Sequence, residues 1–269
     1  MVVYQVRISI SNSKIKNTIL FILGIILIFF IIQILSWIKN DKIVFPDVIE
    51  IIKAFFNILG KASSYEKIGA TLLRLIIALF FSLAFGVLIG LFEGIYPNVR
   101  TVLKPLMMVL RSLPMIVLVV IVMVLVSSSN WDNVPIIGTT ILLIPLISEA
   151  TAEGIVRMDK ALIDVYKLNS NLRPFVVFKV HIPLILGYLK QAFINAIGMG
   201  IKVIVTTEYI VSARPSLGNA IYNSQYMIEY QDIYAYTIVM ILLVLIVEGI
   251  PILLTKLYSY FKYVRQQIH

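Results

Sequence analysis

Six long apolar runs constrain the fold of this chain more than any other sequence feature. They cover residues 18–38, 68–92, 102–126, 135–156, 184–211 and 233–257. An apolar run of about 20 residues forms a helix long enough to cross the roughly 30 Å of hydrocarbon in a bilayer. Because 60% of the chain is hydrophobic and only 14% is charged, we expect an all-α integral membrane protein with about six transmembrane helices.

The sequence contains no internal repeat, low-complexity tract or linker, so we expect a single domain over residues 1–269. The run at 18–38 is too long for a signal-peptide core, and no small-residue cleavage site follows it. Residues 1–66 are therefore interpreted as an uncleaved extra span followed by an interfacial amphipathic segment on the outer side. Residues 67–258 form the expected core of five helices.

Lysine and arginine predict the orientation of the spans. If the spans alternate in direction, 13 cations fall on one side, namely Arg7, Lys14, Lys16, Arg100, Lys104, Arg157, Lys160, Lys167, Arg173, Lys179, Lys256, Lys262 and Arg265. Six fall on the other side, namely Lys39, Lys42, Lys53, Lys61, Lys67 and Arg214. We expect the side with 13 cations, which includes both termini, to be cytoplasmic. This bias also explains the net charge of +9 without any nucleic-acid partner.

The composition argues against catalysis by this chain. It has no cysteine and only two histidines, which excludes a thiolate nucleophile and leaves no histidine cluster for a metal. It also lacks the G-x-x-x-x-G-K-[ST] loop that cradles nucleotide phosphates. We therefore expect no cofactor and no enzymatic activity.

A basic segment at residues 159–183 separates the fourth and fifth apolar runs. Asp159 can cap a short amphipathic helix, Asn169-Ser170-Asn171 can end it, and Pro174 can begin a second short helix before Pro183 opens the next span. Two interpretations stay open on these residues. The segment is either a docking element with a shaped apolar face or an ordinary loop whose cations set the orientation.

These residues resemble the permease subunits of ABC importers. The cytoplasmic loop of that family has the form E-A-A-x-x-x-G, nine further residues, and then I-x-L-P. Asp164 stands at the Glu position, Ser170 at the Gly position and Pro183 at the final Pro, whereas Val165 and Tyr166 replace the two alanines. Four other stretches are similar to the nitrate/sulfonate/taurine branch in the same order, and they lie at 70–91, 103–114, 154–165 and 206–221.

The resemblance implies a type I importer permease fold with a cytoplasmic coupling helix between spans four and five. It implies separate ATP-binding cassette ATPase subunits, a second permease copy in a homodimer or heterodimer, an extracytoplasmic substrate-binding protein and a bacterial inner membrane. The residues that it places in ATPase coupling are Asp159, Leu162, Asp164, Val165, Tyr166, Ser170, Phe178 and Pro183. The variable loop position occupied by His181 is expected to be exposed.

Polar residues inside the spans are the other informative class, because charges in hydrocarbon normally face a cavity or a partner. The expected translocation-pathway residues are Arg111, Pro114, Glu149, Lys202 and Glu208. Glu149 and Glu153 lie on one face of their span, where they line a vestibule or pair with Arg111 or Arg157. Glu208 is either a pathway or gating residue or a hydrogen-bonded structural carboxylate. Lys202 lies six positions away on a different face, so no direct pair with Glu208 is expected.

Glycine and arginine in the second and fifth spans also carry expectations. Gly86, Gly90, Gly198 and Gly200 are expected to allow close helix packing, and Arg74 is expected to reach the outer interface or the pathway. The sequence does not choose the solute, which the resemblance limits to small anions and vitamin precursors such as pyrimidines. A secondary transporter or channel would need inverted repeats or a midplane ion pathway, and neither is present in the sequence.

Overall fold

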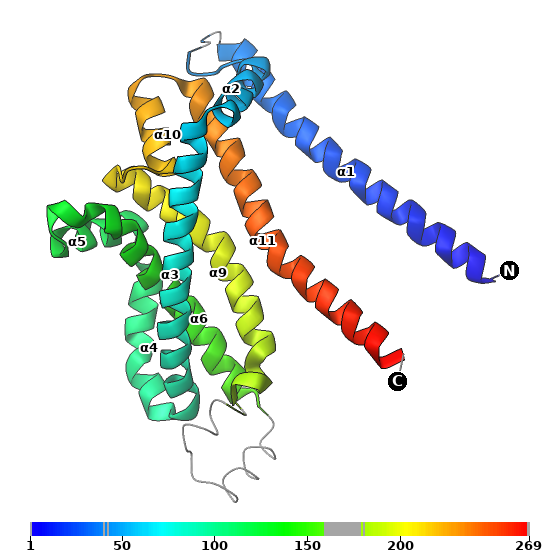
Figure 1. Cartoon of the computed structure of the whole chain (residues 1–269), viewed down its shortest axis with the longest axis vertical. Helices are drawn as coiled ribbons and strands as arrows, with labels where there is room; N and C mark the ends of the chain where they lie inside the picture. Colours follow the sequence, from blue (N-terminus) through cyan, green and yellow to red (C-terminus); the bar gives the residue numbers. More distant parts are fainter. Residues whose placement is uncertain (1, 40, 42, 159–178, 180, 268–269) are drawn as a thin grey trace, which may run out of the picture. The chain divides into compact units, whose positions relative to one another are not determined.

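The computed structural model describes residues 2–39, 41, 43–158, 179 and 181–267 (Figure 1). The described residues are almost entirely helical and include no strand, so the all-α prediction is confirmed for them. They form two compact units. One comprises residues 1–61 and 223–237, and the other comprises residues 62–222 and 238–269.

The first unit contains α1 (Val2–Lys39) and α2 (Val48–Gly60). Asp47 precedes α2, and its Oδ1 accepts hydrogen bonds of 2.9 Å from both Gln33 and Ser36 of α1. The Glu50 carboxylate accepts a 3.2 Å bond from the Asp47 N–H, as in a capping box. Apolar residues recur on one face of α2 and are buried, which agrees with the amphipathic segment expected from the sequence.

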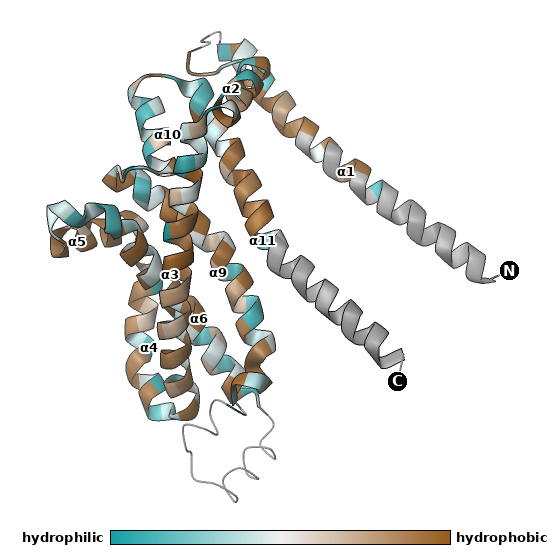
Figure 2. Cartoon of the chain, in the orientation of Figure 1, coloured by the Kyte–Doolittle hydropathy of each residue, from teal (hydrophilic) through white to brown (hydrophobic). Residues whose placement is uncertain are grey.

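The second unit contains the remaining helices. They are α3 (Ala62–Ile95), α4 (Pro97–Ser112), α5 (Met115–Leu125), the 3-10 helix η1 (Ser128–Asn133), α6 (Val134–Val156), α9 (Ile182–Val211) and the greater parts of α10 (Leu217–Tyr226) and α11 (Tyr230–Gln267). Helices α3, α6 and α9 form its packed core. Apolar residues cover most of α3 and α5, whereas polar residues are frequent on α10 (Figure 2).

Close packing of α3 on α6 depends on glycine at every fourth position of α3. A Cβ at Gly86 would lie 2.7 Å from Ile147, one at Gly90 would lie 2.4 Å from the Ser148 carbonyl oxygen, and one at Gly94 would lie 2.7 Å from Ile155. Small residues spaced in this way let two helix backbones approach in a membrane. The packing role expected for Gly86 and Gly90 is confirmed, and Gly200 similarly lies against Leu75 and Leu143.

Four helices are long and apolar enough to span a membrane, at residues 62–95, 128–156, 182–211 and 230–249, when only the described residues are considered. Helices α4 and α5 make a fifth candidate, but they bend by 104° where a single span over 102–126 was expected. That expectation of a continuous helix is wrong. Pro114 cannot donate a backbone hydrogen bond, and Leu113 before it adopts an extended conformation, so the helix ends there.

Short helices form the remaining connections. Helix α10 lies between α9 and α11 along the chain. The polar stretch after α5 forms the short 3-10 helix η1, which makes about two turns. Helix α9 ends at Val211, and Ser212 follows in the left-handed conformation with a φ of 55°. The first expected span, at 18–38, lies within α1 and stays a prediction as a membrane crossing.

Candidate functional sites

A buried ion pair joins α3 to the C-terminal end of α9. The Glu208 side chain is 0% exposed, and its Oε1 accepts a 3.0 Å hydrogen bond from the Arg74 guanidinium. Its Oε2 accepts bonds from the Thr71 hydroxyl at 2.9 Å and from the Gly218 N–H at 3.3 Å. Every carboxylate oxygen therefore has a donor, which is the arrangement that a buried charge needs.

The same cluster fixes the chain that follows α9. Arg74 also donates to the Pro215 carbonyl at 2.7 Å, and the Thr71 hydroxyl accepts a 3.0 Å bond from the Leu217 N–H. Residues 213–218 are thus held against α3 by both side chains. We call Thr71, Arg74 and Glu208 the outer node.

The geometry of the outer node favours one of the two roles considered for Glu208. A carboxylate that is fully enclosed and fully hydrogen-bonded positions the start of α10, and it has no free face for a solute. The Arg74 side chain, expected at the outer interface or in the pathway, is only 12% exposed and pairs with Glu208. Thr71 lies in the stretch at 70–91 that resembles the permease family, but its hydrogen bond to Glu208 was not anticipated, because a threonine inside an apolar run does not indicate its partner.

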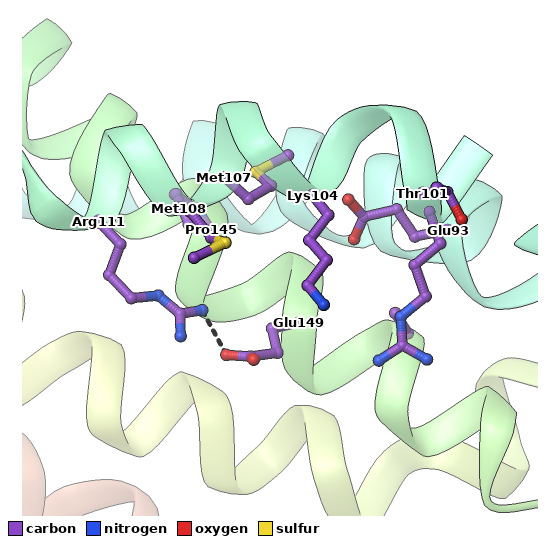
Figure 3. Close-up of a pocket in the computed structure, with 10 residues that line it drawn as sticks. Glu93, Thr101, Lys104, Met107, Met108, Arg111, Pro145 and Glu149 are labelled. Carbon is purple, nitrogen blue, oxygen red and sulfur yellow. Dashed lines mark hydrogen bonds and ion pairs between the residues drawn. The ribbon is translucent and has the colours of Figure 1, made fainter. Parts of the chain in front are cut away.

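A cavity of about 370 Å³ lies between α4 and α6 (Figure 3). Its lining residues are Glu93, Arg100, Thr101, Lys104, Met107, Met108, Arg111, Pro145, Glu149 and Ala152. Lys104 and Arg111 follow Arg100 by four and eleven positions. The three side chains therefore share one face of α4 and span about 16 Å along it. Figure 3 shows Lys104 and Arg111 extending from α4 toward Glu149 of α6.

Two carboxylates also line the cavity, Glu149 from α6 and Glu93 from α3. Glu149 forms an ion pair with Arg111, and the two side chains are 54% and 53% exposed. Glu93 is buried and accepts a 2.8 Å hydrogen bond from the Ser148 hydroxyl. The pairing of Glu149 with Arg111, one of the options drawn from the sequence, is present. Glu93 was not singled out in advance, because it stands at the polar end of its apolar run.

Glu153 pairs with Arg157 at 2.5 Å at the C-terminal end of α6, as the sequence suggested. A hydrogen bond from the Arg157 guanidinium to Glu153 and the charge of that carboxylate raise the pKa of Arg157. Both side chains are exposed, so this pair is a surface interaction of small energetic weight.

The other expected pathway residues lie apart from the cavity. Pro114 stands at the break between α4 and α5, and Lys202 is exposed on α9 without an ion pair in the described part of the chain. Lys202 and Glu208 do not pair, as expected. Pro183 is in the first turn of α9, and the remaining coupling residues, from Asp159 to Phe178, lie outside the described residues.

Two features of the structure were not anticipated. Glu248 of α11 lies against α9, and a Cβ on Gly198 would lie 1.7 Å from its Oε1. An acidic residue inside the last apolar run was the available signal. His181, expected to be exposed, is only 7% exposed, and its Nδ1 has no hydrogen-bond partner among the described residues. Residues 43–158 and 181–249 contain no group of three acidic or histidine side chains placed to hold a metal ion.

A bundle of membrane-length helices with an enclosed ion pair and a cation-lined cavity is typical of a polytopic membrane protein. The model of the family described as "Binding-protein-dependent transport system inner membrane component" matches residues 82–258, which is more than half of the chain. The chain belongs to this family of ABC transporter permease subunits. A comparison with curated proteins found no match.

Membership gives the outer node and the cavity their context. A permease subunit of this family is a multi-pass inner-membrane protein that works with a separate ABC ATPase and a binding protein. Subunits of this family are transport components and are generally not enzymes.

Proposed function

We propose that this chain is the permease of an ATP-driven importer and that the α4–α6 cavity is the inner part of its solute pathway. The observation that carries the proposal is the stripe of three cations on α4 within a region that matches the permease family. Charged side chains inside a membrane bundle normally face a solute or ion route. The cavity, at about 370 Å³, is large enough for a small solute.

The charges of the cavity favour an anionic solute. Arg111 is neutralised by Glu149, and Glu93 is buried, whereas Arg100 and Lys104 have no ion pair in the described part of the chain. A small solute that carries an oxyanion group, as nitrate, a sulfonate and taurine do, fits this excess of positive charge better than a neutral pyrimidine does. It would be received from an extracytoplasmic binding protein and released toward the cytoplasm.

The coupling to ATP is proposed for residues 159–183. Leu162, Val165 and Tyr166 share one face of the first helix expected there, and this face would insert into a cleft of the ATPase. Closure of two ATPases would draw two such helices together and switch two permease copies from inward-open to outward-open. This assignment places both termini in the cytoplasm, in agreement with the cation count on that side.

The test is co-purification of the ATPase with the permease. Leu162→Asp places a charge on the proposed docking face and is expected to abolish ATPase association while membrane insertion is retained. Lys160→Asp is the matched control, because it introduces the same side chain on the polar face of the same segment. Equal association of the ATPase with both variants and with the native chain would reject the coupling assignment. Solute transport by the purified chain without an ATPase would reject the importer assignment.

A further inference from the structure

One polar stripe runs along α9 and is exposed. Between Gln191 and Glu208, the exposed positions of this helix are Gln191, Asn195, Met199, Lys202 and Thr206. They lie four, eight, eleven and fifteen positions after the first, so all five share one helix face. Four of the five are polar, although α9 is long and apolar enough to span a membrane. Polar side chains in a span do not normally face lipid.

Glu248 flanks this stripe from α11. A Cβ on Gly198 would meet its Oε1 at 1.7 Å and its Cδ at 2.9 Å, so the missing side chain of Gly198 makes room for the carboxylate. Gly198 is four residues before Lys202, which corresponds to about 6 Å along the helix axis. A membrane-embedded carboxylate and a membrane-embedded ammonium group therefore border the same face of α9, one helical turn apart.

Neither charge is compensated in the described part of the chain. The Lys202 ammonium has no ion pair there, and the Glu248 carboxylate has no hydrogen bond or ion pair there. A charge held in hydrocarbon without a partner is costly, so water or a solute must reach both groups. The side-chain amides of Gln191 and Asn195 extend this polar surface toward the start of α9, and a 3.1 Å hydrogen bond joins them.

We infer that Lys202 and Glu248 form a binding site in the solute pathway and that this site selects small zwitterions. The anionic group of the solute binds at Lys202, and its amino group binds at Glu248. The inference rests on the proposed permease function. It narrows the solute from any small molecule with an anionic group to one that also carries an ammonium group. Gly198 is the positioning residue that lets Glu248 approach α9.

The chain contains no cysteine, so a single introduced thiol can be labelled without background. Met199→Cys places a thiol on the stripe between Gly198 and Lys202, and Phe80→Cys places one on the exposed apolar surface of α3. The probes are anionic sulfonatoethyl and cationic trimethylammonioethyl methanethiosulfonate, applied to the transporter in its membrane. We expect both reagents to modify Met199→Cys at least about tenfold faster than Phe80→Cys, because thiolates form and react in water.

Charge variants made in the Met199→Cys background then test the binding site formed by Lys202 and Glu248. Lys202→Gln is expected to slow the anionic reagent, and Glu248→Gln to slow the cationic one, each by about threefold, the factor for a unit charge roughly 6 Å away in water. Gly198→Ala should act like Glu248→Gln, since its Cβ displaces the carboxylate. Gly187→Ala is the control on the same helix, because nothing lies within 4 Å of a Cβ there.

The zwitterion assignment has its own test. β-Alanine, propionate and propylammonium each have three carbons. β-Alanine carries both a carboxylate and an ammonium group, whereas each of the other two carries only one of these groups. At equal millimolar concentration, β-alanine is expected to slow labelling of Met199→Cys about twofold or more relative to the other two, and Glu248→Gln should remove that difference.

Any of three results would overturn the inference. The first is labelling of Met199→Cys as slow as that of Phe80→Cys, which would occur if a second copy of the chain covered the stripe. The second is a charge variant that changes the labelling rates of both reagents equally, and the third is protection that does not favour β-alanine. Labelling needs no ATPase activity, so its outcome is independent of co-purification. Failure of the native chain to co-purify with an ATPase, together with normal labelling, would instead count against the proposed importer function alone.

Discussion

Among the side chains that the structure describes, two arginine–glutamate pairs join different helices, in opposite environments. Arg74 and Glu208 are 12% and 0% exposed and are joined by further hydrogen bonds from Thr71 and Gly218. Arg111 and Glu149 are 53% and 54% exposed and face a cavity. The same two functional groups thus occupy a sealed site and an open one within a single helical unit.

The difference in exposure indicates which of the two ion pairs can exchange its partner for a solute. Separating a buried pair leaves a charge without solvent or donor, so the outer node behaves as a fixed joint between α3, α9 and α10. Separating an exposed pair costs little, because water replaces each partner. An incoming anion can therefore take Arg111 from Glu149, whereas no solute can take Arg74 from Glu208.

Removing the carboxylate of the outer node should give the largest effect. Glu208→Ala leaves Arg74 buried without a counter-charge and leaves the Gly218 N–H without an acceptor, which is expected to destabilise the unit by about 3–5 kcal/mol. The measurement is the unfolding free energy or thermal midpoint of the detergent-purified protein. Glu149→Ala is the control in the open pair and should change stability by about 1 kcal/mol or less. Equal destabilisation by both would remove the distinction between the two sites.

Close packing of α3 on α6 holds the sealed region together and predicts the next largest effect. A Cβ at Gly90 would lie 2.4 Å from the Ser148 carbonyl oxygen, which is backbone and cannot rotate away. Gly90→Ala is therefore expected to destabilise the unit by about 1–3 kcal/mol through overpacking. Gly69→Ala lies on the same helix with nothing within 4 Å, and it should leave the thermal midpoint unchanged or slightly raised. A Gly90→Ala protein as stable as the Gly69→Ala protein would show that α3 and α6 are less closely packed.

Part of this picture could be predicted from sequence. Apolar runs indicated the core helices, and the need of charges in a membrane for partners indicated the Arg111–Glu149 pair among its options. The sealed pair could not be predicted, because Arg74 and Glu208 are 134 positions apart and only the packing of α3 on α9 brings them together. The bend at Pro114 was missed for a different reason. Proline is tolerated in many membrane helices, so its presence alone does not distinguish a kink from a break.

The smallest expected effect is the coupling energy of the open pair, and it gives the sharpest form of the comparison. Double-mutant cycles use Arg111→Gln with Glu149→Gln, and Arg74→Gln with Glu208→Gln, because glutamine removes the charge and keeps hydrogen-bonding capacity. The open pair is expected to show about 0.2–1 kcal/mol, and this value should fall as salt is added. The sealed pair should show a larger coupling that salt hardly changes, since its carboxylate has no contact with solvent. A salt-insensitive coupling at Arg111 and Glu149, equal to that of the sealed pair, would mean that the cavity is closed to water and that Glu149 cannot yield Arg111 to a solute.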